Sequence, residues 1–530
     1  MNPGHSIFRA SLLVWMAAAS AENVPVCAKC HAKETTAFLK SPMGNSLAPP
    51  TPLGDGHVAR QNSGIEISIS ARDGRMIHAL SANGLKAEFP VAYQVGAGKI
   101  GYTYVVRIGD YLYESPASWY RQHGWDTSPG YQQMASPDFD RLIDSQCLFC
   151  HADNAKFLGS DGRRFSGSAL NPIGCDRCHG PGDEHAAQPS AKNIINPSKL
   201  SSRARNSVCE QCHLEGETRL LNPGKTWQDF HPGDELERTA VVYLLTQNHQ
   251  EVKAVGQVEQ LALSKCVRAS GGKLWCATCH NPHGEAADRA SQIRDVCRSC
   301  HATLSKASHG DASLSKTSHA AVTECVSCHM ARLTPNDIPH TASTDHRILR
   351  RPAPLTHGDS AGAEIAAWQD PPPQFRARDL AAASLIVGGT HGLDPLRETG
   401  VQLLEALPQA EKDNDATVIS SLISIRLQRH EMEQARELAR KLTEVQPDSG
   451  FASLNLALAL QNSGDDAGAE KQLLHTIELD PSLQAAWVNL VFLYEKQGRQ
   501  AERAALLDRY LKWNPQNIWF RQLKGMLPQN

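Results

Sequence analysis

The sequence has no excess of either charge. Its 53 Lys and Arg residues are balanced by 56 Asp and Glu residues, which gives a formal net charge of -3. Proteins that bind nucleic acid attract phosphates with a surplus of positive charge, so this balance argues against such a partner. A hydrophobic content of 41% with 21% charged residues is typical of a soluble globular protein. At 530 residues the chain exceeds one ordinary core, and two or three domains are expected.

Beyond its N-terminus the sequence also lacks any apolar run long enough to span a bilayer. The N-terminus carries Arg9 ahead of a short apolar stretch, and Ala19-Ser20-Ala21 resembles a cleavage site. A membrane anchor is the alternative, but the stretch is too brief to cross a bilayer comfortably. We therefore interpret residues 1–21 as an export signal peptide. The mature chain is expected to have no transmembrane segment and to lie in the periplasm or outside the cell.

Cysteine is absent after residue 328 and frequent before it. Fourteen of the fifteen cysteines fall into seven C-x-x-C-H motifs, and only Cys266 is left over. A disulfide framework has no reason to place a histidine after every cysteine pair. Structural zinc also uses cysteine pairs and is the alternative interpretation. Seven copies of one pentapeptide favour covalent c-type haem attachment instead.

Each motif therefore predicts one covalently bound haem. Two thiols two residues apart can add to the two vinyl groups of one haem, and the adjoining histidine is then held against the iron. The expected thioether residues are Cys27, Cys30, Cys147, Cys150, Cys175, Cys178, Cys209, Cys212, Cys276, Cys279, Cys297, Cys300, Cys325 and Cys328. The expected proximal iron ligands are His31, His151, His179, His213, His280, His301 and His329. The predicted cofactor is haem c, in seven copies.

A second histidine follows the fifth motif in C-A-T-C-H-N-P-H-G, residues 276–284. This segment already occupies one face of its own haem, so His283 cannot easily reach around to the other face. We expect His283 to ligate a different iron and so to tie neighbouring haems into one packed array. The alternative is a solvent-exposed histidine in a turn.

Four more histidines near the motifs are candidate distal ligands. His185 follows a glycine-rich turn after the third motif, and His319 lies six residues before the seventh. His340 and His346 lie beyond the seventh motif. The segments T-L-S-K-A-S-H and S-L-S-K-T-S-H look like a local duplication, so one of His309 and His319 is expected to be spare, and we favour His319. Each candidate could instead be an ordinary structural histidine.

Met43, in S-P-M-G-N-S after the first motif, is a further candidate ligand. A thioether ligand raises the haem potential relative to paired histidines, whereas ordinary packing is the alternative role for a methionine. The sequence does not choose a seventh ligand among His57, His123, His249 and Cys266. For Cys266, burial as a small apolar group is favoured over a thiolate ligand or a reactive free thiol.

The chain between the first two motifs has a strand-like pattern. I-E-I-S-I-S alternates with period two, A-R-D-G-R is a turn, and a hairpin is expected around Ile108-Gly109-Asp110. We predict a small β insert at about 57–115 within a seven-haem domain spanning 22–350, otherwise made of short helices and loops around the haems. Tyr102, Tyr104, Tyr111 and Tyr113 are expected to pack in this sheet; a docking surface or substrate pocket is the weaker alternative.

A proline-rich linker is expected at 351–377, followed by an all-α domain at 378–530. Pro447, Pro481 and Pro515 recur at a constant step, and Gly464 and Gly498 keep the same step. That step is the period of roughly 34 residues that characterises tetratricopeptide repeats, in which paired helices stack into a solenoid. The solenoid is expected to dock a protein partner or, alternatively, to act as a structural cap on the haem domain.

With these motifs assembled, the sequence resembles exported multihaem cytochromes c with a C-terminal tetratricopeptide region, and is distantly similar to the tetrahaem cytochrome c of ammonia oxidisers. The resemblance covers most of the mature chain. It rests on S-P-M-G-N-S, on S-P-G-Y before the second motif, on C-D-R-C-H-G-P-G, on L-S-K-C with C-A-T-C-H-N-P-H-G, and on T-D-H-R-I after the seventh. It implies distal positions at Met43, His185, His283, His319, His340 and His346.

The resemblance implies electron transfer between redox partner proteins, with no catalytic residue assigned. A multihaem oxidoreductase is the alternative, in which one iron lacks a distal protein ligand and acts on small nitrogen or sulfur compounds. The sequence contains no C-x-x-C-K variant and has many histidines, so it favours the electron carrier. A scaffold with incidental haems is the third and weakest hypothesis.

Overall fold

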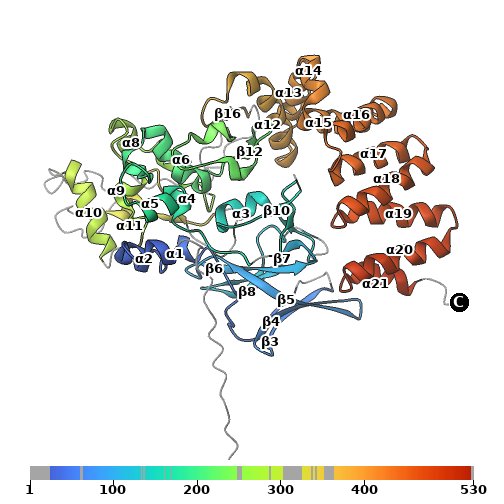
Figure 1. The fold of residues 1–530 in the computed structure, drawn as a ribbon, viewed down its shortest axis with the longest axis horizontal. Helices are drawn as coiled ribbons and strands as arrows, with labels where there is room; N and C mark the ends of the chain where they lie inside the picture. The colour runs from blue at the N-terminus through green and yellow to red at the C-terminus, as the bar shows by residue number, and fades with distance from the viewer. Residues whose placement is uncertain are drawn as a thin grey trace, which may run out of the picture.

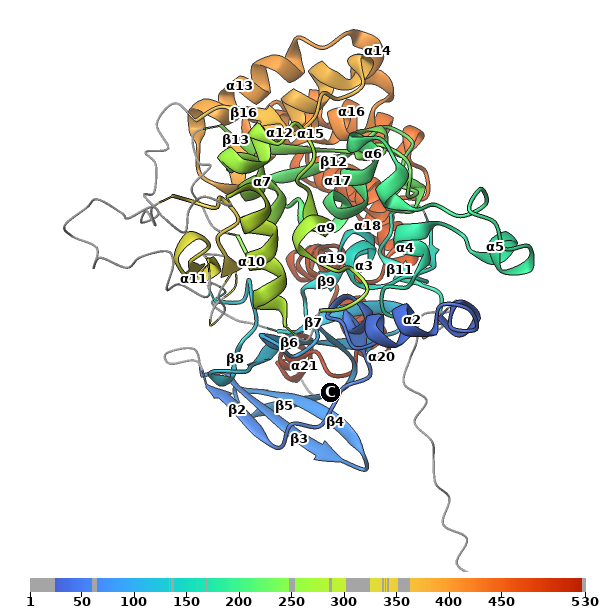
Figure 2. The same ribbon diagram turned by 90° about the vertical axis from the view of Figure 1, so that its left-hand side faces the viewer.

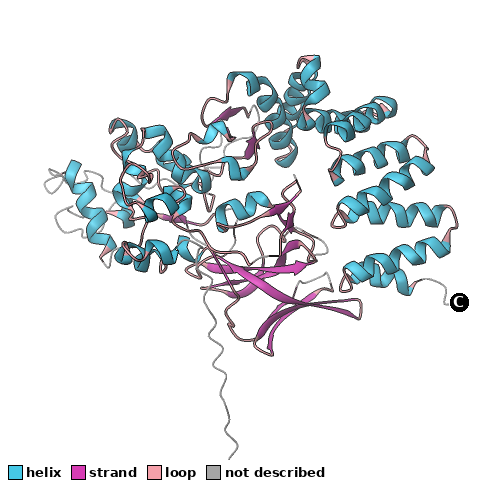
Figure 3. Cartoon of the chain, in the orientation of Figure 1, coloured by secondary structure: helices cyan, strands magenta, loops and turns pink. Residues whose placement is uncertain are grey.

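A computed structural model describes the chain over residues 24–59, 64–132, 134, 138–159, 161–167, 169–246, 253–285, 288–301, 325–335, 338, 340, 343–350 and 363–526. The predicted signal peptide and the candidates His249, His309 and His319 lie outside these residues. Three regions follow one another: a β-sheet, a region of short helices that carries most of the C-x-x-C-H motifs, and a helical solenoid (Figures 1 and 3). Within the described residues, none of the helices combines the length and apolarity needed to cross a membrane.

The sheet contains nine antiparallel strands and is larger than the small insert expected. Its strands are β1 (Leu47–Ala48), β2 (Gly56–Ala59), β3 (Glu66–Arg72), β4 (Arg75–Ala82), β5 (Leu85–Val95), β6 (Gly101–Ile108), β7 (Tyr111–Tyr120), β8 (Gly124–Thr127) and β9 (Leu142–Ile143). The order is β2-β3-β4-β5-β6-β7-β8, with β1 paired to β5 and β9 paired to β7. The sheet curls far enough for β2 and β8 to contact each other.

Both turns expected in this region are present. Asp73 and Gly74 have positive φ angles of 51° and 73° and join β3 to β4. Gly109, at φ 58°, joins β6 to β7 in the predicted hairpin, where Ile108 pairs with Tyr111. Adjacent left-handed residues match the twist of two-residue hairpins, which explains the D-G sequence at the first turn.

The inside of the curled sheet is apolar and contains one buried histidine. Its core includes Ile67, Ile69, Val91 and Tyr104. His78 on β4 is fully buried, its ring lies 4.9 Å from that of Tyr104, and its Nδ1 lies 2.7 Å from the Ser115 hydroxyl oxygen. Burial lowers the pKa of His78 to about 3, because the charged imidazolium loses its hydration there.

The motif-bearing region contains short helices and small strand pairs. Its helices are α1 (Val24–Cys27), α2 (Ala32–Phe38), η1 (Met43–Asn45), α3 (Ser145–His151), α4 (Asp176–His179), α5 (Asp183–Ala187), η2 (Pro197–Lys199), α6 (Ser202–His213), η3 (Trp227–Asp229), η4 (Leu236–Arg238), α7 (Gln257–Leu263), α8 (Lys265–Ala269), α9 (Cys276–Cys279), α10 (Arg289–Cys300) and α11 (Val326–His329). Its strands are β10 (Phe157–Leu158), β11 (Arg164–Phe165), β12 (Thr218–Leu221), β13 (Ala240–Leu245), β14 (Arg332–Leu333), β15 (Ser343–Thr344) and β16 (Ile365–Ala367). Figure 2 shows α6, α9 and α10 between the sheet and the first solenoid helices.

The C-terminal region is a solenoid of antiparallel helices. After η6 (Pro373–Phe375) come α12 (Arg376–Thr390), α13 (Asp394–Glu405), α14 (Gln409–Asn414), α15 (Ala416–Gln428), α16 (Met432–Val445), α17 (Gly450–Asn462), α18 (Asp466–Leu479), α19 (Gln484–Lys496), α20 (Gln500–Trp513) and α21 (Ile518–Gly525). Helices α15, α17, α19 and α21 begin at a constant step along the chain, and α16, α18 and α20 begin at the same step. This step equals the spacing of the prolines and glycines in the sequence, so the predicted repeats are present.

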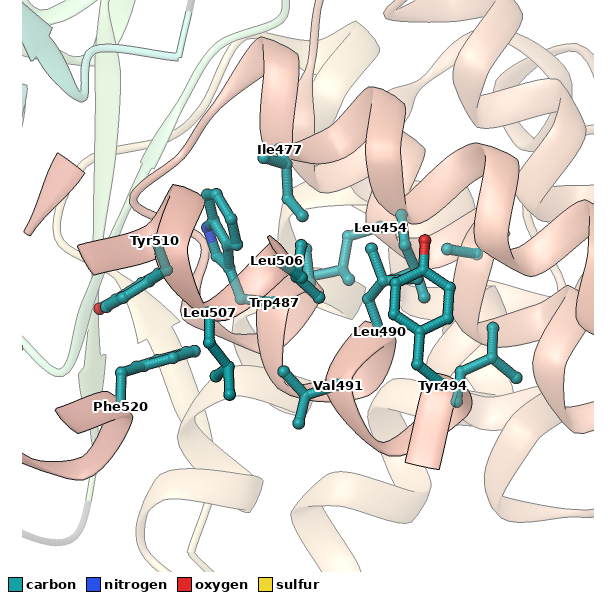
Figure 4. Close-up of a cluster of buried hydrophobic side chains, with 14 residues drawn as sticks. Leu454, Ile477, Trp487, Leu490, Val491, Tyr494, Leu506, Leu507, Tyr510 and Phe520 are labelled. Atoms are coloured by element: carbon teal, nitrogen blue, oxygen red, sulfur yellow. The ribbon is translucent and has the colours of Figure 1, made fainter. Parts of the chain in front are cut away.

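The last repeats share one continuous apolar core. Trp487, Leu490 and Tyr494 on α19 pack against Leu507 and Tyr510 on α20 (Figure 4). The Tyr510 ring stacks at 3.4 Å on Phe520 of α21, so the last helix is packed as firmly as those before it. Each repeat buries much of its apolar surface against its neighbours, which is why the array is stable as a stack.

Both ends of the solenoid are packed onto the rest of the chain. At its start, Ala382 and Ala383 of α12 pack against Val241 and Tyr243 of β13. At its end, Ile518 and Trp513 join the sheet cluster that contains Phe89 and Phe139. β16 and η6 lie within the linker expected at 351–377, and β16 pairs with β13, so the described part of that segment is structured. The solenoid thus spans from one face of the motif region to the sheet (Figure 1).

An ion pair fastens the middle of the solenoid. Arg163, beside β11, donates to the Asp480 carboxylate at 2.8 Å and to the Ser482 hydroxyl at 2.9 Å, and its guanidinium lies 4.7 Å from the Phe451 ring centre. The Asp480 side chain is only 2% exposed. Loss of Arg163 would therefore leave a buried carboxylate without its cation.

We predict that Arg163→Met destabilises the docked solenoid by about 3 kcal/mol, because removing one partner of a buried ion pair strands the other charge. The measurement is the urea midpoint of the far-UV circular dichroism signal. Arg440→Met, at an exposed position of α16, is the matched control and should leave the midpoint unchanged. Equal midpoints for both variants would show that the Arg163 contact does not hold the solenoid.

We also predict that His78 makes the sheet acid-sensitive. Its folded-state pKa lies below that of an unfolded histidine, so the unfolded chain binds the extra proton between about pH 6.5 and pH 3. Stability contributed by the neutral ring is complete above that window and is lost as the pH falls through it. His78→Gln should flatten the dependence of unfolding free energy on pH by up to about 1.4 kcal/mol per pH unit. His57→Gln, at an exposed position of β2, should not alter the slope.

Candidate haem array

All seven motifs line one cavity. Its volume is about 5540 Å³, several times the 300–1,000 Å³ or so that accommodates an ordinary small ligand. All fourteen motif cysteines and all seven motif histidines face it, and none of the fifteen cysteines forms a disulfide. A void of this size and lining fits several large flat groups attached through sulfur, which is what c-type haems require.

Each described motif adopts one helical turn. The histidine N–H donates to the carbonyl of the first motif cysteine, for example His280 to Cys276 at 2.9 Å and His179 to Cys175 at 3.0 Å. Residues three apart on such a turn lie on the same side, so both thiols can meet one ligand edge. Longer helices position some motifs: α3 is capped by Asp144 and α6 by Ser201, and each ends in its motif histidine.

Three predicted distal histidines face three predicted proximal histidines. The ring centres of His31 and His185 lie 6.2 Å apart with an angle of 22° between the planes. His179 and His283 are separated by 5.9 Å and 6°. His280 and His346 are separated by 6.2 Å and 23°.

These separations match two axial ligands on one metal. Two metal–nitrogen bonds of about 2 Å each, with about 1.1 Å from each nitrogen to its ring centre, separate the ring centres by about 6.2 Å. Direct stacking of two imidazoles would instead bring them closer together, as for His123 and His340 at 3.8 Å. The three facing pairs therefore leave room for one iron each.

Hydrogen bonds orient several of these rings. Nδ1 of His179 donates to the Ile195 carbonyl at 2.7 Å, and Nδ1 of His346 donates to the Thr344 carbonyl at 2.7 Å. Nδ1 of His329 donates to the Leu349 carbonyl at 2.8 Å. Because a carbonyl only accepts, Nδ1 carries the proton and Nε2 has a free lone pair for a metal.

Burial favours the neutral form of several cavity imidazoles. It lowers the pKa of His280 to about 4 and also lowers the pKa of His151, His213, His283 and His346. Loss of hydration is the largest cause for each of these five groups. A neutral imidazole is the form that ligates metals, so the cavity favours ligation at neutral pH.

Contacts between thiols place neighbouring motifs side by side. Side-chain interactions that perturb the pKa of at least one thiol in each pair place Cys27 near Cys175, Cys150 near Cys212, Cys209 near Cys276, and Cys297 near Cys325. Electrostatic interactions at longer range relate Cys178 to Cys209 and Cys279 to Cys297. Each motif therefore has at least one other motif near the atoms that would carry haem.

The structure does not bring every candidate into a facing pair. Among the described residues, His151 and His213 have no second imidazole opposite them at this spacing. His301 and His329 lie close in sequence to residues 302–324, which include His319 and are outside the described part. Met43 lies in η1 and lines the cavity, and the Ser46 hydroxyl after it donates to the His151 carbonyl at 2.9 Å. The ligand roles of Met43 and His319 stay predictions.

The remaining candidates lie in different surroundings. Cys266 on α8 is half-buried and lines the cavity. His57 is exposed on β2, 3.8 Å from Glu66, and is not among the cavity residues. His340 is also absent from the cavity lining and contacts His123 and Asp126 at the edge of the sheet.

Two cavity residues, Thr390 and His391, come from the end of the first solenoid helix, and the sequence analysis missed both. His391, which follows α12, lines the cavity, and its Nε2 lies 3.0 Å from the Glu217 carboxylate. Lys253 donates to the same carboxylate at 2.9 Å. The neighbouring H-G sequence is typical of an ordinary helix end, so nothing in the sequence indicates this contact.

Of the four tyrosines expected to pack in the sheet, Tyr104, Tyr111 and Tyr113 are buried. This agrees with a structural role for them.

Comparisons with known proteins support the haem assignment. The family model described as "Doubled CXXCH motif" matches residues 268–306, and the model described as "Cytochrome c554 and c-prime" matches residues 118–180. Together they support a multihaem c-type cytochrome. No curated protein matches the chain. The more specific likeness to a cytochrome of ammonia oxidisers stays a prediction.

Solved structures resemble part of the chain. A structure titled MamA AMB-1 is 22% identical and covers 28% of this chain and 79% of its own, with a TM-score of 0.22. Pseudomonas aeruginosa pilF is 16% identical and covers 26% and 62%, also with a TM-score of 0.22. YrrB, titled a TPR protein with an unusual peptide-binding site, is 15% identical and covers 28% and 76%, with a TM-score of 0.23. The solenoid is assigned from its own regular helix spacing.

We predict that His283→Ala in the holo-protein converts one low-spin iron to high spin, because the iron opposite His179 loses its second imidazole. The measurement is the optical and electron paramagnetic resonance spectrum of the oxidised protein. The affected iron should belong to the third motif. A variant that also lacks Cys175 and Cys178 has no haem there, so it should lose the high-spin signal that His283→Ala produces. His475→Ala, on the exposed side of α18, is the control. A fully low-spin His283→Ala protein would contradict the pairing.

Proposed function

We propose that the chain is an exported electron-transfer protein that holds seven covalent haems c in one array, with the solenoid docking redox partner proteins. The observation that carries this proposal is the set of three facing imidazole pairs inside a cavity lined by all seven motifs. The haem would supply reversible one-electron exchange at iron. The chain's own residues fix, orient and bury the groups between which electrons pass.

The thiol contacts support an order for the array. The first, third, fourth and fifth motifs form one run through Cys27–Cys175, Cys178–Cys209 and Cys209–Cys276. Cys279–Cys297 and Cys297–Cys325 extend the run to the sixth and seventh. Among these thiol pairs the second motif is related only to the fourth, through Cys150 and Cys212. We propose a main path with one side branch.

The solenoid supports partner docking through an exposed face of two of its helices. Phe492 on α19 is 53% exposed, which is unusual for phenylalanine, and Phe451 on α17 is 45% exposed although the Arg163 guanidinium lies against one side of its ring. Asn455 and Asn489 hold equivalent places one repeat apart on the same helices. Aromatic side chains of this kind commonly anchor protein interfaces. The fixed position of the solenoid would hold a bound partner at a constant distance from the haems.

A second candidate function is a multihaem oxidoreductase, and one observation favours it. Within the described residues, neither His151 nor His213 faces another imidazole. An iron with an open position could bind a small nitrogen or sulfur compound. Carbon monoxide separates the two functions, because it binds ferrous haem only where a coordination position is open. Binding by the native reduced protein would favour the oxidoreductase.

We predict that the mature exported protein carries seven haems. Intact-mass measurement after export should show a mass excess equal to seven haems over the polypeptide without residues 1–21, and the pyridine haemochrome assay should give the same ratio. Replacing Cys147 and Cys150 with Ala should remove one haem and alter the redox titration of a single neighbour. Replacing Cys276 and Cys279 should remove one haem and alter two. A colourless protein with the mass of the bare polypeptide would refute the proposal.

A further inference from the structure

A cluster of metal-binding side chains lies outside the haem cavity. His123 follows β7, Asp126 is on β8, and His340 comes from the segment after the seventh motif. One ligand atom from each of the three lies within 4.8 Å of the others. None of the three lines the cavity that contains the seven motifs.

Both imidazoles point at the same oxygen. Nε2 of His340 lies 2.7 Å from Oδ2 of Asp126, and Nε2 of His123 lies 3.1 Å from that same atom. The second oxygen, Oδ1, accepts the Thr127 backbone N–H at 2.6 Å. That bond fixes the carboxylate and directs Oδ2 toward the two rings. The cluster is therefore oriented by the strand that carries it.

The ring geometry excludes a shared haem iron. The rings of His123 and His340 stack at 3.8 Å with an angle of 6°, whereas the three facing pairs in the cavity are separated by 5.9–6.2 Å. Two axial ligands approach an iron atom from opposite sides, whereas the stacked rings of His123 and His340 lie side by side. Two rings on one side, with a carboxylate between their nitrogens, is an arrangement for a small ion.

The donor set matches a divalent transition-metal ion. Imidazole suits Zn²⁺, Cu²⁺ and Ni²⁺, and a carboxylate adds negative charge. Two donors bonded at 2.0–2.1 Å to a tetrahedral ion are about 3.3 Å apart. The two Nε2–Oδ2 distances, 2.7 and 3.1 Å, are near this separation, and all three ligand atoms lie within 4.8 Å of one another. The three side chains are 31–48% exposed, which leaves room for a water ligand.

The backbone of His340 is also unusual. Its φ angle is 54°, in the left-handed region that non-glycine residues seldom occupy. The Tyr120 ring lies 5.1 Å from the His340 ring, edge to face, and supports it from the strand before the cluster. A side chain held this way against a distant segment of the chain needs a strong partner to offset the backbone strain.

We propose that His123, Asp126 and His340 bind one Zn²⁺-class divalent ion, which ties the segment after the seventh motif to the edge of the sheet. In this role His340 is a zinc ligand instead of the distal haem ligand expected from the sequence. The ion would bind at Nε2 of both rings, whose protons pass through solvent to Nδ1 of the same neutral imidazoles, and would remove the competition of two donors for one oxygen atom.

The test uses the complete holo-protein, prepared without a histidine tag. After chelation and dialysis against Zn²⁺, plasma emission should give one zinc for every seven irons, with iron as the internal standard. Titration calorimetry should show at least about 100-fold weaker zinc binding by His123→Ala, Asp126→Asn and His340→Ala. His57→Ala is the matched control, because it removes a histidine that pairs with one carboxylate on the same sheet and has no third donor.

Several outcomes would overturn the proposal. One is wild-type protein that retains no zinc, and another is zinc retained equally by the three variants and the control. A third is a new high-spin haem signal in His340→Ala with unchanged zinc content, which would make His340 a haem ligand. Far-UV circular dichroism verifies that each variant is folded. Zinc should also raise the melting temperature of the wild type and the control but not of Asp126→Asn.

Discussion

The facing arrangement of histidines from distant segments is the constraint on which the motif-bearing region depends. His185, just after the third motif, faces His31 of the first. His283, just after the fifth, faces His179 of the third, and His346, after the seventh, faces His280 of the fifth. Each segment that follows one of these motifs therefore completes the site two motifs earlier. The motifs are linked as a relay, so none of these three sites is formed by a contiguous piece of chain.

This relay explains how a region with little apolar core can be stable. Iron bonds across the three pairs would close long loops between the paired histidines, the longest of them between His31 and His185. Closing long loops removes much of the conformational entropy of the unfolded chain. The flat apolar haems would fill the 5540 Å³ cavity that the side chains leave between the helices. Folding and haem attachment should thus be one coupled process in this region, as metal binding and folding are in other metal-dependent domains.

Local features of the fold could be predicted from the sequence. The hairpin at Gly109, the D-G turn at Gly74 and the repeat period of the solenoid depend on short-range rules of backbone conformation and helix packing. His283 was also expected to serve a different iron, because a histidine three residues from its motif cannot reach the far face of its own haem. These inferences need only neighbouring residues, which is why sequence alone supports them.

The features that could not be predicted depend on contacts between distant segments. His340 follows the seventh motif more closely than His346 does, yet the fold of the sheet presents Asp126 and His123 to His340. The size of the sheet was underestimated for a similar reason: β8 and β9 are short, and they are strands only because β7 pairs with them.

The solenoid adds a second long-range constraint, which bears on electron transfer. It is held at α12, at Asp480 and at α21, so it cannot swing as a tethered domain would. His391 at the end of α12 reaches the cavity wall and shares Glu217 with Lys253. A partner bound to the solenoid would thus be held at a fixed distance from the nearest haem. Because electron-transfer rates fall steeply with distance, three-point attachment is better suited to a docking platform for redox partners than a flexible linker would be.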